Sequence, residues 1–254
     1  MLTPGALNLF FALSALTMIL VAGYFPFKKR FSAEAHTEFP IGETLATGVF
    51  LGAALLHMLP EAQNLFLKLN YHYPLGLLIM GIVFLLFLWF EHLGEVLYHH
   101  HDNHTTHPAF AIVAWVMLSL HSLVLGTALG LSQDYSMQIM LFLAIIAHKW
   151  AESFAIAVQL NKSTLSPKYA IALFLSFAFM TPFGIGIGYY FGQDANTHSL
   201  VDPILMAISA GTFLYLGTLH GLERCVMVQR CCNLRDFSFV IIGFLLMAAV
   251  AVYT

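Results

Sequence analysis

Four residues with polar or metal-ligating side chains lie inside two strongly apolar stretches of the chain. His121 and Ser122 begin the stretch HSLVLGTALG, and His148 and Glu152 lie in HKWAE further along. A charged group at the centre of a bilayer costs about 2.5–3.5 kcal/mol on the insertion scale, so such groups pair, line a water-filled cavity or hold an ion. Imidazole nitrogens and a carboxylate oxygen suit a borderline divalent ion such as zinc. These residues therefore predict a metal site inside a membrane.

The composition of the chain indicates a membrane protein. Of 254 residues, 59% are hydrophobic and only 9% are charged, and the mean hydropathy is +0.81. A soluble domain usually carries about 25% charged residues. Because no long polar segment interrupts the chain, we expect one membrane domain over residues 1–254. Nothing in the sequence resembles a nucleic-acid-binding patch.

Apolar runs of about 20 residues each match the thickness of a bilayer core. The sequence therefore predicts an all-α integral membrane fold with eight transmembrane helices. The predicted helices lie at about 3–26, 41–68, 75–97, 109–131, 137–160, 168–192, 203–224 and 236–254. The first run is expected to stay in the membrane rather than act as a signal peptide, because basic residues follow it and none precedes it.

The distribution of Lys and Arg predicts the orientation of these helices. Eight cations lie in one alternating set of loops: Lys28, Lys29, Arg30, Lys162, Lys168, Arg224, Arg230 and Arg235. The opposite set has only Lys68, and Lys149 lies inside the fifth predicted helix. Cytoplasmic loops carry the excess of positive charge. The sequence therefore predicts both termini outside the cytoplasm.

This topology predicts that His121, His148 and Glu152 meet near the middle of the membrane. At about 1.5 Å per residue, His121 lies roughly 18 Å from the inner end of helix 109–131, and His148 and Glu152 lie roughly 16–22 Å from the outer end of helix 137–160. A connection of a few residues predicts an antiparallel pair. Gly126 and Gly130 form a small-residue surface that allows close backbone approach. The alternative for a single intramembrane His is a hydrogen bond to a neighbouring helix.

With these motifs, the chain resembles the ZIP (Zrt/Irt-like) family of divalent metal transporters. FLGAALLHMLPEA (50–62), FAFMTPFGIGIG (177–188) and SAGTFLYLGTLHGLE (209–223) are similar to the family's second, sixth and seventh helices. The resemblance implies eight helices with both termini outside and transport of Zn²⁺, or of Fe²⁺, Mn²⁺ or Cd²⁺, into the cytosol. It also implies that the fourth and fifth helices hold the ion and move by an elevator-like shift.

The sequence departs from the family pattern at the metal site. Leu125 stands where many ZIP proteins have an acidic residue, and Lys149 occupies the position where Asp or Glu would hold a second metal. An ammonium there would repel a second cation and could pair with Glu152, three residues away. We therefore expect a single transport site of His121, His148 and Glu152, supplemented by Ser122 or water. In the seventh helix, His220 replaces a common acid, and Glu223 is its candidate replacement.

Further polar residues suggest a path for the ion. Glu43, His57 and Glu61 fall near one face of helix 41–68. His57 and Glu61 could line an access route from outside. The alternative is a role in helix capping or packing. Pro60 should kink this helix and free a backbone carbonyl. At the cytosolic end, the candidates for an exit route are Glu91, His92, Glu95, His220 and Glu223. The alternative is that these side chains simply extend towards water at the membrane interface.

A histidine-rich loop is predicted on the cytoplasmic side at 98–108. It carries His99, His100, His101, His104 and His107. Such tracts bind metals without strict geometry, so the loop could buffer or sense cytosolic metal, and the alternative is a spacer. Cys225, Cys231 and Cys232 fall on or beside another cytoplasmic loop and are expected to be reduced.

Two other function classes deserve comparison with a transporter. An intramembrane zinc-dependent hydrolase could use His121, His148 and Glu152 as ligands, but Glu152 would then be unavailable as a base, and the HEXXH pattern is absent. A non-transporting metal sensor is the second alternative. We expect no enzyme activity, no organic cofactor, and only divalent metal ions and the lipid bilayer as partners. A homodimer is plausible through small-residue faces, and the plasma membrane or a bacterial inner membrane is the expected location.

Overall fold

The structure, a computed structural model, describes most of the 254-residue chain. The described ranges are 4–31, 39–97, 108–132, 134–191, 200–218 and 234–252. Within them, the side chains at 29–31, 91, 94–97, 108–110 and 201 are not described.

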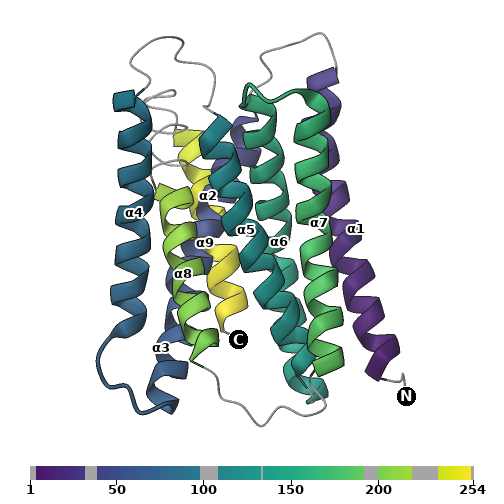
Figure 1. The fold of residues 1–254 in the computed structure, drawn as a ribbon, viewed down its shortest axis with the longest axis vertical. Coiled ribbons are helices and arrows are strands. Elements are labelled where there is room, and N and C mark those ends of the chain that lie inside the picture. The colour runs from purple at the N-terminus through teal and green to yellow at the C-terminus, as the bar shows by residue number, and fades with distance from the viewer. Residues whose placement is uncertain are drawn as a thin grey trace. The chain divides into compact units, whose positions relative to one another are not determined.

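The described residues form eight helical segments, which confirms the predicted all-α fold (Figure 1). Proline is the first residue of four of them, where its missing N–H has no intrahelical partner to lose. The segments are α1 (Pro4–Phe31), α2 (Pro40–Gly52) continued by a π-helical turn (Ala53–Met58) and α3 (Leu59–Lys68), α4 (Leu75–Leu97), α5 (Pro108–Leu131), α6 (Tyr135–Lys162), α7 (Pro167–Phe191), α8 (Val201–Tyr215) and α9 (Leu234–Ala251).

Six of these segments are long and apolar enough to cross a membrane, so the chain is a multi-pass membrane protein. They are Pro4–Lys28, Pro40–Lys68, Ala111–Leu131, Tyr135–Lys162, Pro167–Phe191 and Leu234–Ala251. The other two predicted spans correspond to α4, whose described apolar part is Leu75–Phe90, and to α8, which is described over 15 residues. Eight crossings and the orientation of the termini therefore stay predictions.

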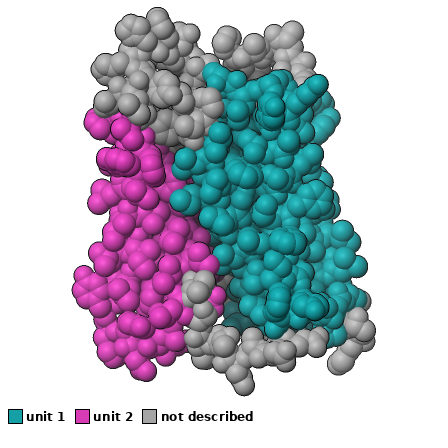
Figure 2. All heavy atoms as spheres, viewed as in Figure 1, with its two compact units in different colours: residues 1–37, 106–197, 253–254 teal, residues 38–105, 198–252 magenta. Residues whose placement is uncertain are grey.

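The chain divides into two compact units (Figure 2). One unit contains residues 1–37, 106–197 and 253–254, and therefore α1, α5, α6 and α7. The other contains residues 38–105 and 198–252, and therefore α2 to α4, α8 and α9. A single transport domain over 1–254 stays a prediction.

In the first unit, α1 packs against α6 and α7 through aromatic contacts. Phe11 stacks on Phe142 of α6 with ring centroids 4.4 Å apart, and Phe27 meets Phe174 of α7 edge-on at 5.2 Å. The buried stripe of α1 is Leu7, Phe11, Ala15, Ile19 and Phe27. Its other face leaves Leu9, Phe10, Leu13 and Val21 more than half exposed, and a helix this apolar on its exposed face is suited to lipid contact.

Glycines bring the backbones of α5 and α7 into contact in the same unit. A Cβ added to Gly126 would meet Thr181 O, and one added to Gly184 would meet Leu123 O. The same holds between Gly130 and the Ile185 carbonyl. The small-residue surface of α5 therefore faces α7, whereas the sequence suggested close approach between α5 and α6. The reason is that a matching glycine series, which includes Gly184 and Gly188, lies on α7.

The second unit contains another close helix pair, α2 with α9. A Cβ on Gly48 would meet the Val240 carbonyl, and one on Gly243 would meet the Leu45 carbonyl. Beside this pair, α4 packs on α8, where the Phe87 and Tyr215 rings stack with centroids 5.1 Å apart. Both units therefore use small residues to place helix backbones against each other.

A π-helical turn ends two residues before Pro60, at which the sequence predicted a kink and a freed carbonyl. Residues Ala53–Met58 form this turn, and the N–H of Leu59 donates to the carbonyl of Ala54, five residues earlier. Because Pro60 has no N–H, it cannot continue the regular hydrogen-bond ladder. A π-helical turn is one of the recognised ways for a helix to absorb such a break.

Candidate metal centre

The four predicted site residues lie on two helices of the first unit. His121 and Ser122 lie on α5, and His148 and Glu152 lie on α6. Residues four apart on a helix share a face, which places His148 and Glu152 together. His121 is 3% exposed, and the other three side chains are fully buried. The helix α6 begins after Asp134, whose carboxylate accepts hydrogen bonds from two backbone N–H groups of the first turn.

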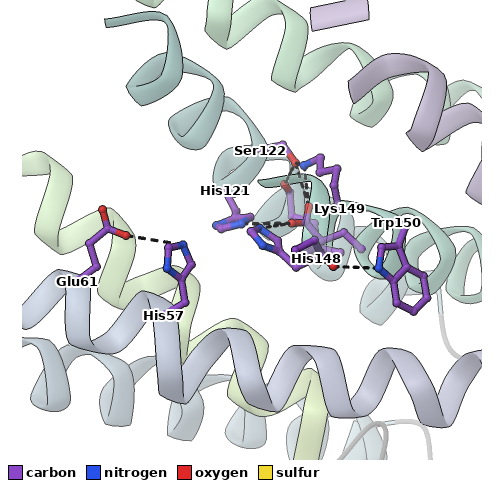
Figure 3. A network of polar contacts seen from close by, with 10 residues as sticks. His57, Glu61, His121, Ser122, His148, Lys149 and Trp150 are labelled. Carbon is purple, nitrogen blue, oxygen red and sulfur yellow. Dashed lines mark hydrogen bonds and ion pairs between the residues drawn. The ribbon is translucent and has the colours of Figure 1, made fainter. Parts of the chain in front are cut away.

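The carboxylate of Glu152 has two kinds of neighbour. Figure 3 shows His121, Ser122, His148 and Lys149 close together. Its Oε1 lies 3.3 Å from His121 Nε2 and 3.3 Å from His148 Nε2. Its Oε2 accepts a hydrogen bond of 2.7 Å from Lys149 Nζ. One oxygen of the carboxylate therefore faces the two imidazoles, and the other faces an ammonium group.

The histidine side of this cluster has the donor atoms and spacing of a zinc site. His121, His148 and Glu152 each offer a ligand atom within 4.8 Å of the others. A tetrahedral zinc ion with bonds of about 2.0–2.1 Å holds its ligand atoms about 3.3 Å apart. Both histidine–carboxylate distances already equal that spacing. The three residues could therefore hold a divalent ion.

Lys149 is fully buried and forms the ion pair with Glu152 that the sequence predicted. Its Nζ also donates to Ser122 Oγ on α5 and lies 5.1 Å from the ring centroid of Phe177 on α7. A buried ammonium needs such partners, because removing a charge from water costs several kcal/mol. Lys149 therefore joins three helices at the site.

The hydroxyl of Ser122 lies on the Lys149 side of the carboxylate. Ser122 Oγ donates to the Leu118 carbonyl at 2.6 Å, accepts from Lys149 Nζ, and is 3.4 Å from Glu152 Oε2. This geometry gives Ser122 a role in holding Lys149 and Glu152. Its predicted part in metal binding stays a prediction.

Sequence reasoning did not find Phe177 as a neighbour of the site. Phe177 lies 28 residues after Lys149, on a helix whose rotation the sequence pattern does not define. The adjacent Trp150 is not the aromatic partner of Lys149 in this arrangement. Its indole N–H donates to the Ala147 carbonyl at 2.9 Å, which is a packing role.

The residues of the predicted access route lie in the second unit. His57 belongs to the π-helical turn and Glu61 to α3, and His57 Nε2 is 3.7 Å from Glu61 Oε2. The His57 side chain is 6% exposed and that of Glu61 is 33% exposed. The two side chains therefore form a close pair in which Glu61 is the more exposed member.

Most residues of the predicted exit route and loop fall outside the described part of the chain. The side chain of His92 is exposed. The side chains of Glu91 and Glu95 are not described, and neither are His220, Glu223 and the loop histidines His99, His100, His101, His104 and His107.

The fold and the cluster together define a class of protein. It is a helical membrane protein that buries two imidazoles, a carboxylate and an ammonium in one helical unit, and the imidazoles and carboxylate could bind a metal cation. The sequence comparisons then identify the family. The model of the ZIP zinc transporter family matches residues 103–251, which is more than half of the chain.

Named relatives agree with this match. The chain is 29% identical to the zinc transporter ZIP2 of Mus musculus over 82% of its own length and 83% of the relative's. It is 27% identical to ZIP2 of Homo sapiens, with shares of 82% and 84%. It is also 30% identical to ZIP1 of Danio rerio, with shares of 60% and 51%. The chain belongs to the ZIP zinc transporter family, so it is a zinc transporter and not an enzyme.

Proposed function

We propose that this protein carries Zn²⁺ into the cytosol through one site formed by His121, His148 and Glu152. The observation that carries the proposal is the buried group of three ligand atoms, all within 4.8 Å of one another. Family membership and relatives named as zinc transporters support zinc as the ion. Fe²⁺, Mn²⁺ and Cd²⁺ are further candidate ions, since a site of two imidazoles and a carboxylate accepts several divalent metals.

The site holds a single ion in this proposal. Lys149 occupies the place of a second metal, and its charge lies against Glu152 Oε2 at 2.7 Å. Leu125, one turn after His121, provides no ligand. A stoichiometry of two zinc ions per chain at this site, measured after removal of the loop histidines, would contradict this part of the proposal.

Transport into the cytosol is the direction that the resemblance to the ZIP family implies, and the proposed orientation identifies which loops face the cytosol. Eight Lys and Arg residues in one set of loops against one in the other set support termini outside the cytoplasm. Zinc would then enter past His57 and Glu61 and leave past Glu91, His92, Glu95, His220 and Glu223 towards the histidine-rich loop. The plasma membrane or a bacterial inner membrane is the proposed location, and a homodimer is the proposed assembly.

The mechanism is alternating access by an elevator-like shift. All three ligands belong to one compact unit, the unit of α1, α5, α6 and α7. Movement of that unit as a body would carry the ion without breaking the site. The small-residue contacts between α5 and α7 support rigid movement, because close backbone packing leaves little freedom between the two helices.

The test is the flux of radioactive zinc into proteoliposomes that contain the purified protein. We expect saturable flux with wild type, and loss of that flux in His148→Ala and in Glu152→Ala. Flux should survive deletion of residues 99–107, because the loop is not part of the transport site. A folded protein that binds zinc but shows no flux would refute the proposal.

A further inference from the structure

In the proposed function Lys149 keeps a second metal out of the site, but its effect on the one ion that binds there is not yet defined. It is the only Lys or Arg among the buried residues of the described part of the chain. Lysine is almost never fully buried unless it is paired. Its position beside the ligands raises the question of what the ammonium does to the ion that binds there.

The ammonium group engages one oxygen of the ligating carboxylate. Glu152 Oε2 accepts from Lys149 Nζ at 2.7 Å, and the Ser122 hydroxyl lies 3.4 Å from the same oxygen. Ser122 itself is held by the Leu118 carbonyl. The second oxygen, Oε1, is left to face His121 and His148, each at 3.3 Å.

A carboxylate arranged in this way directs only one of its oxygens towards the two imidazoles. Rotation of Glu152 to bring both oxygens onto the ion would break its ion pair with Lys149 inside a fully buried site. Breaking a buried pair leaves an uncompensated charge, which is strongly unfavourable. The site therefore provides two nitrogens and one oxygen, with further positions left for water.

This donor set separates two groups of divalent ions. Zinc is satisfied by four ligands and accepts imidazole nitrogens. Calcium takes six to eight oxygen ligands, often including a bidentate carboxylate, and magnesium requires near-octahedral oxygen coordination. Manganese also prefers oxygen ligands. A site that withholds the second carboxylate oxygen disfavours all three hard ions.

We propose that Lys149, held by Ser122, is a specificity-determining residue that restricts Glu152 to one metal-facing oxygen and so selects zinc over harder divalent ions. This inference rests on the proposed function, because it assumes that the transported ion binds to His121, His148 and Glu152. It assigns Lys149 a positioning role, since the ammonium acts on the ion through Glu152.

The test measures selectivity between ions and not the affinity for zinc alone. A change in affinity for zinc would follow simply from removal of a nearby positive charge. Removing the Lys149 charge strengthens the binding of every divalent ion, so the ratio between ions carries the information. Zinc flux into proteoliposomes is measured in competition with Mn²⁺ and with Ca²⁺, for wild type and for Lys149→Leu. We expect the competitor concentration for half-inhibition, relative to the KM for zinc, to fall by about tenfold or more in the variant.

Three controls keep the result interpretable. Lys162→Leu makes the same substitution near the end of α6, away from the site, and should keep the wild-type ratio. Lys149→Arg keeps the positive charge and the hydrogen-bond donors, so it should also keep the wild-type ratio. Ser122→Ala leaves the charge but removes one partner of Lys149, and should shift the ratio in the same direction by a smaller factor.

A second measurement needs no substitution at the site. X-ray absorption at the zinc edge, on protein without residues 99–107, should show two imidazole nitrogens and a single carboxylate oxygen. A bidentate carboxylate would overturn the inference, and so would an unchanged ion ratio in an active Lys149→Leu protein. Absence of zinc flux in wild type would instead refute the proposed function.

Discussion

Ser153, the residue after Glu152, donates a hydrogen bond of 2.6 Å from its hydroxyl to the carbonyl of Ile19 on α1. Both side chains are fully buried. The contact joins α1 to the turn of α6 that carries the carboxylate ligand. Hydrogen bonds between helices in a membrane contribute about 0.6 kcal/mol on average and up to about 1.7 kcal/mol.

Replacement of this hydroxyl should therefore weaken the unit slightly without removing a ligand. We expect Ser153→Ala to lower the free energy of unfolding by about 0.6–1.7 kcal/mol. Thermal denaturation in detergent measures this change. Zinc binding should remain, and a complete loss of binding in a folded Ser153→Ala protein would show that the contact also sets the ligand geometry.

The pair of Glu152 and Lys149 predicts a non-additive double mutant. Glu152→Gln should destabilise the protein by about 3–5 kcal/mol, because it leaves the Lys149 charge buried without its counter-ion. Lys149→Met in the same chain should recover much of that stability, because both charges are then absent.

Zinc flux separates the structural role of this pair from its role in transport. Neither Glu152→Gln nor the double mutant should carry zinc, since both lack the carboxylate ligand. Thermal stability and flux are measured on the same preparations. Recovery of flux in the double mutant would mean that Glu152 is not a ligand.

Zinc itself should stabilise the folded protein if the three residues bind it. A ligand at one hundred times its Kd adds about 2.7 kcal/mol to the stability of the state that binds it. We expect zinc to raise the midpoint of thermal unfolding in protein without residues 99–107, and His121→Ala to abolish the rise. If zinc raised the midpoint of thermal unfolding equally with and without His121→Ala, the bound zinc would lie at another site.

The glycines of α7 offer a matched test of the contact with α5. A Cβ on Gly184 would meet backbone atoms of Leu123 and Thr127, whereas a Cβ on Gly186 would meet nothing within 4 Å. Gly184→Ala should destabilise the protein by about 1–3 kcal/mol through overpacking. Gly186→Ala should be neutral or stabilising by about 0.4–1 kcal/mol. Equal midpoints of thermal unfolding for the two variants would contradict the packing.

His57 and Glu61 should influence the supply of zinc rather than its passage. If they line the access route, His57→Ala and Glu61→Ala raise the KM for zinc, and the kcat stays close to that of wild type. Initial rates over a range of zinc concentrations separate the two constants. A fall in kcat with no change in KM would indicate a role in the movement of the protein.

The sequence predicted the helices well because their physical causes are local. Runs of apolar residues define α1 and α7 almost by themselves, and the meeting of His121 with His148 and Glu152 followed from counting residues along two helices joined by a short loop. The rotation of α5 was harder to predict. Its glycines face α7, because Gly184 and Gly188 provide a complementary surface about 60 residues away in the sequence.

The environment of Lys149 shows where sequence reasoning reaches its limit. Its pairing with Glu152 is a contact within one helix, and spacing alone predicts it. Its contacts with Ser122 and Phe177 come from two other helices, and they depend on how three helices pack. The division of the carboxylate between Oε1 and Oε2 follows only from those contacts.

The π-helical turn before Pro60 has a consequence for the whole of Pro40–Lys68. Buried residues recur every fourth position across it: Ala46, Phe50, Ala54, Met58, Ala62 and Phe66. In a regular α-helix, each step of four residues overshoots a full turn by about 40°, so such a stripe would wind away from its partners. The wider turn at Ala53–Met58 takes up part of this excess rotation. The turn therefore accommodates one extra residue, and a single-residue deletion there would restore a regular helix while leaving Ala62 and Phe66 on the face that points into the core.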